Sequence, residues 1–170
     1  LGLGDVYKRQ GHYSVVDGGG GRHGHVHGVG EGLPDGAQAA RGVVALGGIL
    51  SNVPAIERKL GLDQAIEASG GKVKLLDFQP ADWNEQKAFE IMQAWLTRFG
   101  DDIKGVFAAN DGMGGGALEA LRQNGLAGKV QVVGLDGIEA AVAAVEAGEF
   151  AGTVAWDPAW TGGMGLAIPY

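Results

Sequence analysis

Polar side chains stand directly after two short apolar runs of this sequence, in positions where they could bind a ligand. Asn110 and Asp111 follow the run 106–109, and Asp136 comes soon after the run 130–133. Apolar runs of this length are typical of strands that are buried on both faces of a parallel sheet. Ligands of open parallel sheets bind outside the carboxyl ends of the strands. An amide and carboxylates at these places therefore predict hydrogen bonds to the hydroxyl groups of a ligand.

The same side chains also suit the first turns of helices, where short polar residues accept hydrogen bonds from free backbone N–H groups. Asp111 could cap the helix that follows it, and Asp136 could cap the helix after Gly137. For Asp111 the cap is the favoured interpretation. For Asn110 and Asp136 the position alone decides nothing, and both interpretations stay open.

A glycine pattern at the same place raises a third interpretation. Gly112, Gly114 and Ala117 fit the G-x-G-x-x-A spacing of dinucleotide-binding turns, and Asp136 could supply the acid at the end of the next strand. An NAD(P)-dependent Rossmann oxidoreductase is therefore an alternative. Two polar residues argue against it, because they separate the strand from the first glycine and because an anionic side chain beside a pyrophosphate is unfavourable.

Aromatic and basic side chains add further candidates. Trp83 follows one predicted strand and Trp156 ends another, so an indole at either place could stack on the apolar face of a sugar ring. Packing against the edge of the sheet explains Trp83 equally well. Arg58 lies on the first predicted helix, where most arginines are solvated or pair with a nearby acid.

Catalytic and metal-binding arrangements find little support in the sequence. His23, His25 and His27 alternate as on a strand, which would suit zinc or nickel, but their glycine-rich surroundings favour a segment without a metal site. No Ser-His-Asp, Cys-His or paired-carboxylate arrangement accompanies a supporting motif. The sequence therefore predicts a protein that is not an enzyme and that uses no metal or cofactor.

The candidate residues lie on a regular alternation of strands and helices. Apolar runs predict strands that begin near positions 42, 73, 104, 130 and 152, with helical patterns between them. This rhythm predicts an α/β protein with three layers, α/β/α, around a mostly parallel, doubly wound sheet.

Local signals indicate how the helices begin and which faces they bury. Pro54 suits the first turn of a helix whose apolar face would be formed by Ile56, Leu60 and Ile66. The segment 82–85 has capping-box spacing, and a strong apolar stripe follows it.

Composition divides the chain in two. Residues 1–40 hold 12 of the 33 glycines and all four histidines, and they keep no helical or strand period beyond position 16. This low-complexity segment is predicted to be disordered, or to be an artefact rather than native protein. Residues 41–170 are predicted to form one α/β lobe, which is incomplete because its pattern stops abruptly.

Charge and residue types exclude several classes of partner. The formal net charge of the 170 residues is −7, which argues against nucleic acids and anionic membranes. The lack of cysteine excludes disulfides and thiolate metal sites. No apolar run has the roughly 18 residues needed to cross a bilayer. The opening LGLGDVYKRQ lacks the apolar segment of a signal peptide.

Four motifs occur in order between positions 43 and 167, namely QPADWNEQKAFEIMQAWL, GVFAANDGMGGGALEALRQNG, VVGLDG and AGTVAWDP. In this order and spacing they resemble the C-terminal lobe of periplasmic sugar-binding proteins of the ribose-binding type. These type I periplasmic binding proteins are the solute receptors of ABC transporters. The resemblance implies two similar α/β lobes, joined by three hinge crossovers, that close around a sugar.

The resemblance also implies ligand roles for individual residues. Arg58 matches an arginine that hydrogen-bonds sugar hydroxyls, Asn110 matches the asparagine of the F-A-x-N-D motif, and Asp136 matches the aspartate of G-F-D-G. Trp83 matches an aromatic side chain that stacks on the sugar ring. Trp156 is a further candidate, but it stands where ribose binders have a glutamine, which argues against ribose itself.

Neighbouring residues take other roles in this resemblance. Asp111 becomes a structural residue rather than a ligand. Gly112, Gly114 and Gly115 replace the bulkier residues that the family has at this helix start, so a looser turn is expected.

The implied function is that of the solute-binding component of an ABC importer in the bacterial periplasm. Its ligand would be a monosaccharide or polyol, and its partner would be the transporter permease. The protein would be a monomer without direct membrane insertion, and its signal peptide would be missing from this fragment. Because half of the cleft is absent, we expect the chain alone to bind sugar weakly or not at all. The effector-binding domain of a lactose-repressor-type transcription regulator, which shares the two-lobed architecture, is an alternative.

Overall fold

The structure, a computed structural model, describes residues 14–16 and 40–155. Its strands are β1 (Ser14–Val16), β2 (Arg41–Gly47), β3 (Val73–Pro80), β4 (Ile103–Ala108), β5 (Gln131–Asp136) and β6 (Phe150–Ala155). Its helices are α2 (Val53–Ala68), α3 (Glu85–Phe99), the short 3-10 helix η1 (Gly100–Asp102), α4 (Asp111–Gln123) and α5 (Glu139–Glu146). The predicted alternation of strands and helices is therefore confirmed from β2 to β6.

The six strands form one sheet in the order β1-β6-β5-β4-β2-β3. Strands β2 to β6 are parallel to their neighbours, and β1 runs antiparallel to β6. The chain moves from β2 outward to β3, and then returns past β2 to add β4, β5 and β6 on the other side. This is the mostly parallel, doubly wound sheet that the sequence predicts.

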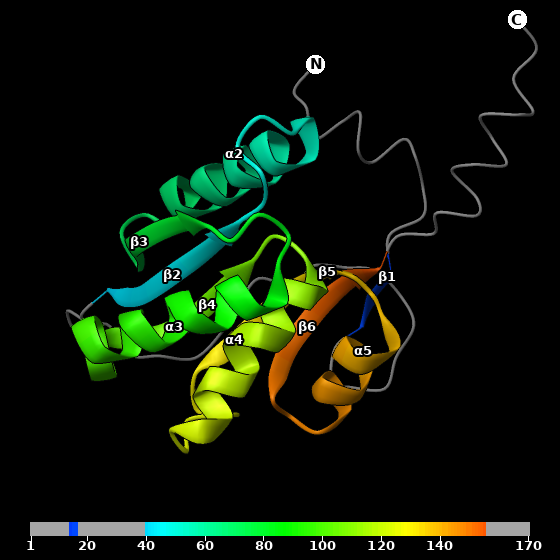
Figure 1. The fold of residues 1–170 in the computed structure, drawn as a ribbon. Helices are drawn as coiled ribbons and strands as arrows, with labels where there is room; N and C mark the ends of the chain where they lie inside the picture. Colours follow the sequence, from blue (N-terminus) through cyan, green and yellow to red (C-terminus); the bar gives the residue numbers. More distant parts are fainter. Residues whose placement is uncertain (1–13, 17–39, 156–170) are drawn as a thin grey trace, which may run out of the picture.

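Right-handed crossover connections place the helices on both faces of this sheet. The connection from β2 to β3 carries α2. The later connections run the opposite way across the sheet, and they place α3, α4 and α5 on the other face. Figure 1 shows α3 and α4 side by side in front of the strands, with α2 apart from them, above β3 in this view. The predicted three-layer α/β/α architecture is thus confirmed.

The core lies between the sheet and the helices α3 to α5. Met92 and Trp95 from α3 and Leu121 from α4 are almost fully buried in it. Each such side chain stabilises the fold by roughly 1.5–3 kcal/mol. The two helices approach closely at Gly116, where a Cβ would lie 2.1 Å from the Glu85 carbonyl oxygen. This packing fixes α4, and with it the residues at the end of β4.

Helix α2 departs from the prediction for its apolar face. Ile56 is 53% exposed and Leu60 is 45% exposed, so the predicted apolar face is wrong for these two residues. The more buried side of the helix carries Ala55, Leu62 and Ile66, which recur at helical spacing. Apolar residues occur on two sides of α2, and the sequence pattern does not tell which side meets the sheet.

The start of α3 also differs from the prediction. The N-cap is Asn84, whose Oδ1 accepts a hydrogen bond of 2.8 Å from the Lys87 N–H. Asp82, which the capping-box spacing predicts as the cap, lies before the helix and pairs with the Lys87 ammonium at 2.6 Å. The predicted cap is therefore wrong by two positions. Pro54 lies in the first turn of α2, as predicted.

Some predictions concern residues that the structure does not describe. His23, His25 and His27 lie outside the described residues, and of the segment 1–40 only β1 and residue 40 are described. In the described part of the chain, no helix is long and apolar enough to cross a membrane. The described residues also contain no group of three or more His, Asp or Glu side chains that could hold a metal ion.

Candidate functional site

Four of the predicted site residues follow four neighbouring strands of the sheet. In the order of the sheet they are Asp136 at the end of β5, Asn110 after β4, Arg58 on α2 after β2, and Trp83 after β3. Because these strands are adjacent and parallel, their carboxyl ends meet at one edge, which we call the ligand edge. The fifth candidate, Trp156, lies outside the described residues.

The Arg58 side chain connects three of these strand ends. Its Nη1 donates a hydrogen bond of 2.5 Å to the Ala109 carbonyl, and its Nη2 lies 3.5 Å from Asp136 Oδ1. The guanidinium carbon lies 5.5 Å from the centroid of the Trp83 ring, which is within the range of an attractive cation–π interaction. The paired interpretation of Arg58 is therefore confirmed, and these contacts hold its guanidinium group in one orientation.

Trp83 lies in a strained turn between β3 and α3. Asp82 and Trp83 have φ angles of 54° and 63°, in the left-handed region that bulky residues rarely adopt. The indole packs on the backbone of Gly48, where a Cβ would lie only 2.0 Å from the ring carbon Cζ2. Packing of Trp83 against the edge of the sheet is thus confirmed. The side chain is half-buried, so part of its surface is still accessible to a ligand.

Asn110 combines a helix cap with an available amide group. It is the N-cap of α4, and its Oδ1 accepts a hydrogen bond of 2.9 Å from the Met113 N–H. The cap fixes the orientation of the side chain at the ligand edge. Because the oxygen serves the helix, the NH₂ group is what Asn110 can offer to a ligand.

Asp111 does not cap the helix that it begins, because Asn110 already occupies that position. Its carboxylate is buried and accepts hydrogen bonds from the backbone N–H groups of Gly137 and Ile138, at 2.7 and 3.1 Å. The hydroxyl of Thr153 donates to the same carboxylate at 2.7 Å. The predicted cap is therefore wrong. The contacts of Asp111 are those of a structural link between α4 and the loop after β5.

Asp136 lies at the β5 end of the ligand edge with a partly buried carboxylate. Burial raises the pKa of Asp136 above the usual value for an aspartate. The Arg58 guanidinium lowers this pKa and the charge of Asp111 raises it. The net effect is a raised pKa. Its φ angle is 123°, again in the left-handed region. The capping alternative is excluded, because the N-cap of α5 is Ile138 and has no side-chain cap.

The glycines after Asn110 lie inside a helix rather than in a phosphate-binding turn. Helix α4 begins at Asp111, so Gly112 and Gly114 belong to its first turn instead of the tight strand-to-helix loop of dinucleotide sites. The Gly114 N–H closes this turn by donating to the Asn110 carbonyl at 3.1 Å. The expected looser turn is therefore not observed, and the dinucleotide-binding alternative loses its structural basis.

The fold agrees with a comparison against known families. A model of the periplasmic binding protein domain matches residues 26–168 of the chain. The chain belongs to the periplasmic binding protein family.

Individual relatives of this periplasmic binding protein domain are sugar and polyol binders by name. The xylitol-binding protein of Mycolicibacterium smegmatis is 42% identical over 111 residues, which are 65% of this chain and 31% of that protein. The Caulobacter myo-inositol binding protein, solved with myo-inositol bound, has a TM-score of 0.72 at 33% identity, over 76% of this chain and 44% of that one.

A solved structure with higher identity is that of a twin-arginine translocation pathway signal protein from Burkholderia phytofirmans. Its TM-score is 0.71 at 60% identity, over 76% of this chain and 40% of that chain. The chain therefore spans less than half of the length of each of these three relatives.

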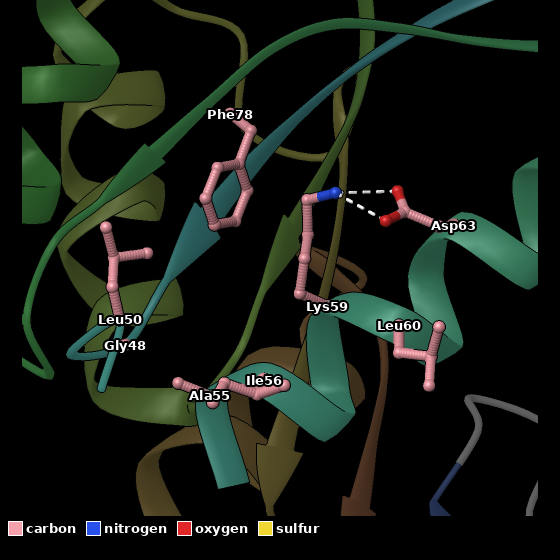
Figure 2. Close-up of a pocket in the computed structure, with 8 residues that line it drawn as sticks. All are labelled: Gly48, Leu50, Ala55, Ile56, Lys59, Leu60, Asp63 and Phe78. Atoms are coloured by element: carbon pink, nitrogen blue, oxygen red, sulfur yellow. Dashed lines mark hydrogen bonds and ion pairs between the residues drawn. The ribbon is translucent and has the colours of Figure 1, made fainter. Parts of the chain in front are cut away.

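A pocket of this domain lies between α2 and β3 and reaches Gly48 beside the ligand edge. It has a volume of about 310 Å³ and is lined by Gly48, Leu50, Ala55, Ile56, Lys59, Leu60, Asp63 and Phe78 (Figure 2). Lys59 points toward Asp63, and its ammonium lies 2.7 Å from both carboxylate oxygens. The other side chains of the lining are apolar, so the pocket offers few hydrogen bonds to a polyol. The ligand edge is the better candidate site.

Two residues beside the ligand edge escape the sequence patterns. Gly48 marks only the end of a strand in the sequence, and Thr153 is one residue of a predicted strand. Their contacts with Trp83 and Asp111 cross between strands that are distant in the sequence. The roles of Gly48 and Thr153 can be recognised only once the strand order is known.

Proposed function

We propose that this chain provides half of the ligand site of a solute receptor, which binds a neutral monosaccharide or polyol in the periplasm for an ABC importer. The receptor catalyses no reaction. The observation that carries this proposal is the placement of Arg58, Asn110 and Asp136 at one sheet edge of a periplasmic binding protein domain. Each of these side chains is held by contacts of its own, so the edge is ordered before a ligand arrives.

The three polar side chains match the hydrogen-bonding needs of a polyol. Arg58 donates from a planar fork that Ala109 and Asp136 hold in place. Asn110 donates through its NH₂ group, and the Asp136 carboxylate accepts. A hydroxyl group both donates and accepts, so a single hydroxyl can bridge the arginine and the aspartate. Adjacent hydroxyls, as polyols and sugars carry, can satisfy the whole set together.

The partly exposed indole of Trp83 supplies the apolar surface that a sugar ring also needs. The C–H face of a sugar can pack on an aromatic plane while its hydroxyls point sideways to polar groups. Because the Arg58 guanidinium lies 5.5 Å from the ring centroid, a sugar at this indole is close to the arginine as well.

Charge supports a neutral ligand. Arg58 and Asp136 lie 3.5 Å apart and are each about a quarter to a third exposed, so their opposite charges largely compensate each other. A sugar acid or a sugar phosphate would compete with Asp136 for the guanidinium and would meet the negative carboxylate. A polyol can hydrogen-bond to both groups without disturbing the pair.

Other parts of the proposal concern the whole protein. The chain spans less than half of each relative, so we infer that a second lobe supplies the opposite wall of the cleft and that a permease is the partner of the whole receptor. Trp156, directly after β6, is a further ligand residue, and the receptor is a monomer. The names of the xylitol-binding and myo-inositol binding relatives support a ligand of this class.

Without the second lobe, binding to this chain is expected to be weak, because the site cannot exclude water and hydrogen bonds to solvent compete. Amide NMR of the isotope-labelled 170-residue chain detects such binding. The probes are xylitol, myo-inositol and D-ribose, with reduced nicotinamide cofactor as the competing class. We expect a polyol or sugar to shift the backbone amides of Asn110 and Asp136 and the indole N–H of Trp83.

Matched variants locate the binding. R58A should abolish these shifts, whereas R98A should keep them, because Arg98 lies in the last turn of α3 and is largely exposed. Shifts of the same groups by the nicotinamide cofactor, with none by any polyol or sugar, would contradict the proposed function.

A further inference from the structure

A buried carboxylate and a buried hydroxyl lie directly behind the ligand edge. Asp111 is 2% exposed and Thr153 is 1% exposed. The Thr153 hydroxyl oxygen lies 2.7 Å from Oδ1 and 2.9 Å from Oδ2 of Asp111. A buried carboxylate is strongly unfavourable unless hydrogen bonds satisfy its oxygens. The partners of this carboxylate therefore indicate what it does.

Its other partners are the two backbone amides that follow Asp136. The N–H groups of Gly137 and Ile138 donate to Asp111 Oδ2 at 2.7 and 3.1 Å. The Gly137 N–H also lies 3.2 Å from the Thr153 hydroxyl oxygen. Asp111 and Thr153 thus bind the backbone immediately after the carboxylate that we propose as a ligand group.

The backbone at this point needs such support. Asp136 has a φ angle of 123° and Gly137 has one of 72°, and a positive φ at a residue other than glycine persists only where surrounding contacts hold it. Gly134 makes room for the Asp111 carboxylate, because a Cβ at position 134 would lie 2.1 Å from Asp111 Oδ1. The orientation of Asp136 at the ligand edge therefore depends on groups beneath it.

We propose that Asp111 and Thr153 are positioning residues, which fix the Asp136 carboxylate for ligand binding; this inference rests on the function proposed above. Asp111 directly follows Asn110 in the chain, so its carboxylate ties the end of β4 to the end of β5 and sets the spacing of the two ligand residues. Because both members of the pair are buried, they act on the ligand through Asp136.

Hydrogen exchange tests the link without any ligand. In the 170-residue chain, T153V and D111N should speed amide exchange at Gly137 and Ile138 by roughly tenfold, as expected when a buried hydrogen bond to a charged group is lost. T153S keeps the hydroxyl and should exchange like the unmodified chain. Exchange at Val132, inside the preceding strand β5, should stay slow in every variant. Unchanged exchange at Gly137 and Ile138 in T153V would overturn the proposal.

Titration with xylitol and myo-inositol, followed by NMR, tests whether the link matters for the ligand. D111N and T153V should weaken binding by roughly tenfold, the range for coupled residues of one network, while T153S should bind normally. D111N combined with D136N should bind no more weakly than D136N alone, because Asp111 then has no carboxylate to position.

The outcomes separate a positioning role from a merely structural one. The proposal would be overturned if the losses of affinity caused by D111N and D136N add in the double variant. It would also be overturned if T153V or D111N speeds exchange but leaves the affinity unchanged. If D111N does not fold, T153V and its matched control T153S carry the test. If the unmodified chain responds to the nicotinamide cofactor and to no polyol while T153V still speeds exchange, the proposed function fails and the link to the Asp136 loop stands.

Discussion

Gly48, directly after β2, lies against the face of the Trp83 indole from the turn after β3. A Cβ at position 48 would be 2.0, 2.2 and 2.3 Å from three consecutive ring atoms, Cζ2, Cε2 and Cη2. Distances this similar place the Cβ above the six-membered ring rather than beside its rim. One face of the indole is therefore covered by backbone, and only glycine permits this contact.

We predict that G48A displaces the Trp83 indole while leaving the fold intact. The ring is the end of a side chain and can move, so the loss of stability should be about 1 kcal/mol, at the lower end for an overpacked site. The ¹⁹F NMR resonance of Trp83 in fluorotryptophan-labelled protein, assigned with W83F, should shift, and sugar binding should weaken.

G61A is the matched control for this substitution. Gly61 lies inside α2, and a Cβ there would meet nothing within 4 Å. Alanine should stabilise the helix by about 0.5–1 kcal/mol without moving the Trp83 resonance. An unshifted resonance in G48A would show that the indole does not lie on Gly48.

A second prediction concerns the pH dependence that Asp136 causes. Burial raises its pKa in the folded protein, more than the Arg58 guanidinium lowers it. The folded state therefore holds the Asp136 proton more tightly than the unfolded chain does. The resulting stabilisation is complete below the unfolded pKa, about 3.9, and is lost as the pH rises through the folded pKa.

Urea unfolding of the chain and of D136N over a range of pH measures this contribution. The free energy of unfolding of the chain, relative to that of D136N, should decrease from about pH 4 upward. Sugar binding should change in the opposite sense and strengthen as Asp136 loses its proton, because the ionised carboxylate is the stronger acceptor for a hydroxyl. A relative stability that increases with pH would show that the Arg58 pair outweighs burial.

Much of the fold could be predicted from the sequence, because its elements carry local signals. The five predicted strand starts lie within two residues of those in the structure. Apolar runs such as 106–109 identify buried strands, and their alternation with helices dictates a parallel sheet. The strand order then brings Arg58, Asn110 and Asp136 to one edge. The strand ends predicted this placement for Asn110 and Asp136, whereas only the family resemblance indicated it for Arg58.

Contacts between distant segments could not be predicted in this way. The sequence favours Asp111 as a cap of its own helix, because a local partner is all that spacing can show. Its actual partners follow β5 and lie in β6. The capping-box spacing likewise predicts Asp82 as the cap of α3, whereas the cap in the structure is Asn84, beyond the left-handed backbone of Trp83.

A third prediction compares the same substitution on two helices. Leu60 on α2 is 45% exposed, whereas Leu121 on α4 is fully buried. L121A should lower the free energy of unfolding by about 2–5 kcal/mol, and L60A should change it by about 0.5 kcal/mol or less. Denaturant unfolding of both variants measures the difference. A large loss for L60A would mean that this side of α2 is packed rather than open.

The last prediction concerns the contact between α3 and α4. A Cβ at Gly116 would lie 2.1 Å from the Glu85 carbonyl oxygen and 3.1 Å from the Phe89 nitrogen, both backbone atoms that no rotamer change can move. G116A must therefore separate the two helices, and should lower the free energy of unfolding by roughly 1–3 kcal/mol. Its neighbour Gly115 would meet only the Glu85 carboxylate, at 3.5 Å.

G115A is thus the internal control for G116A in the same helix. Alanine is a better helix former than glycine, so G115A should raise the free energy of unfolding by up to about 1 kcal/mol. Both variants can be compared by denaturant unfolding. G116A should also weaken sugar binding, because α4 carries Asn110 and Asp111 at its start, whereas G115A should not. Equal stability of the two variants would mean that α3 and α4 are not in contact at Gly116.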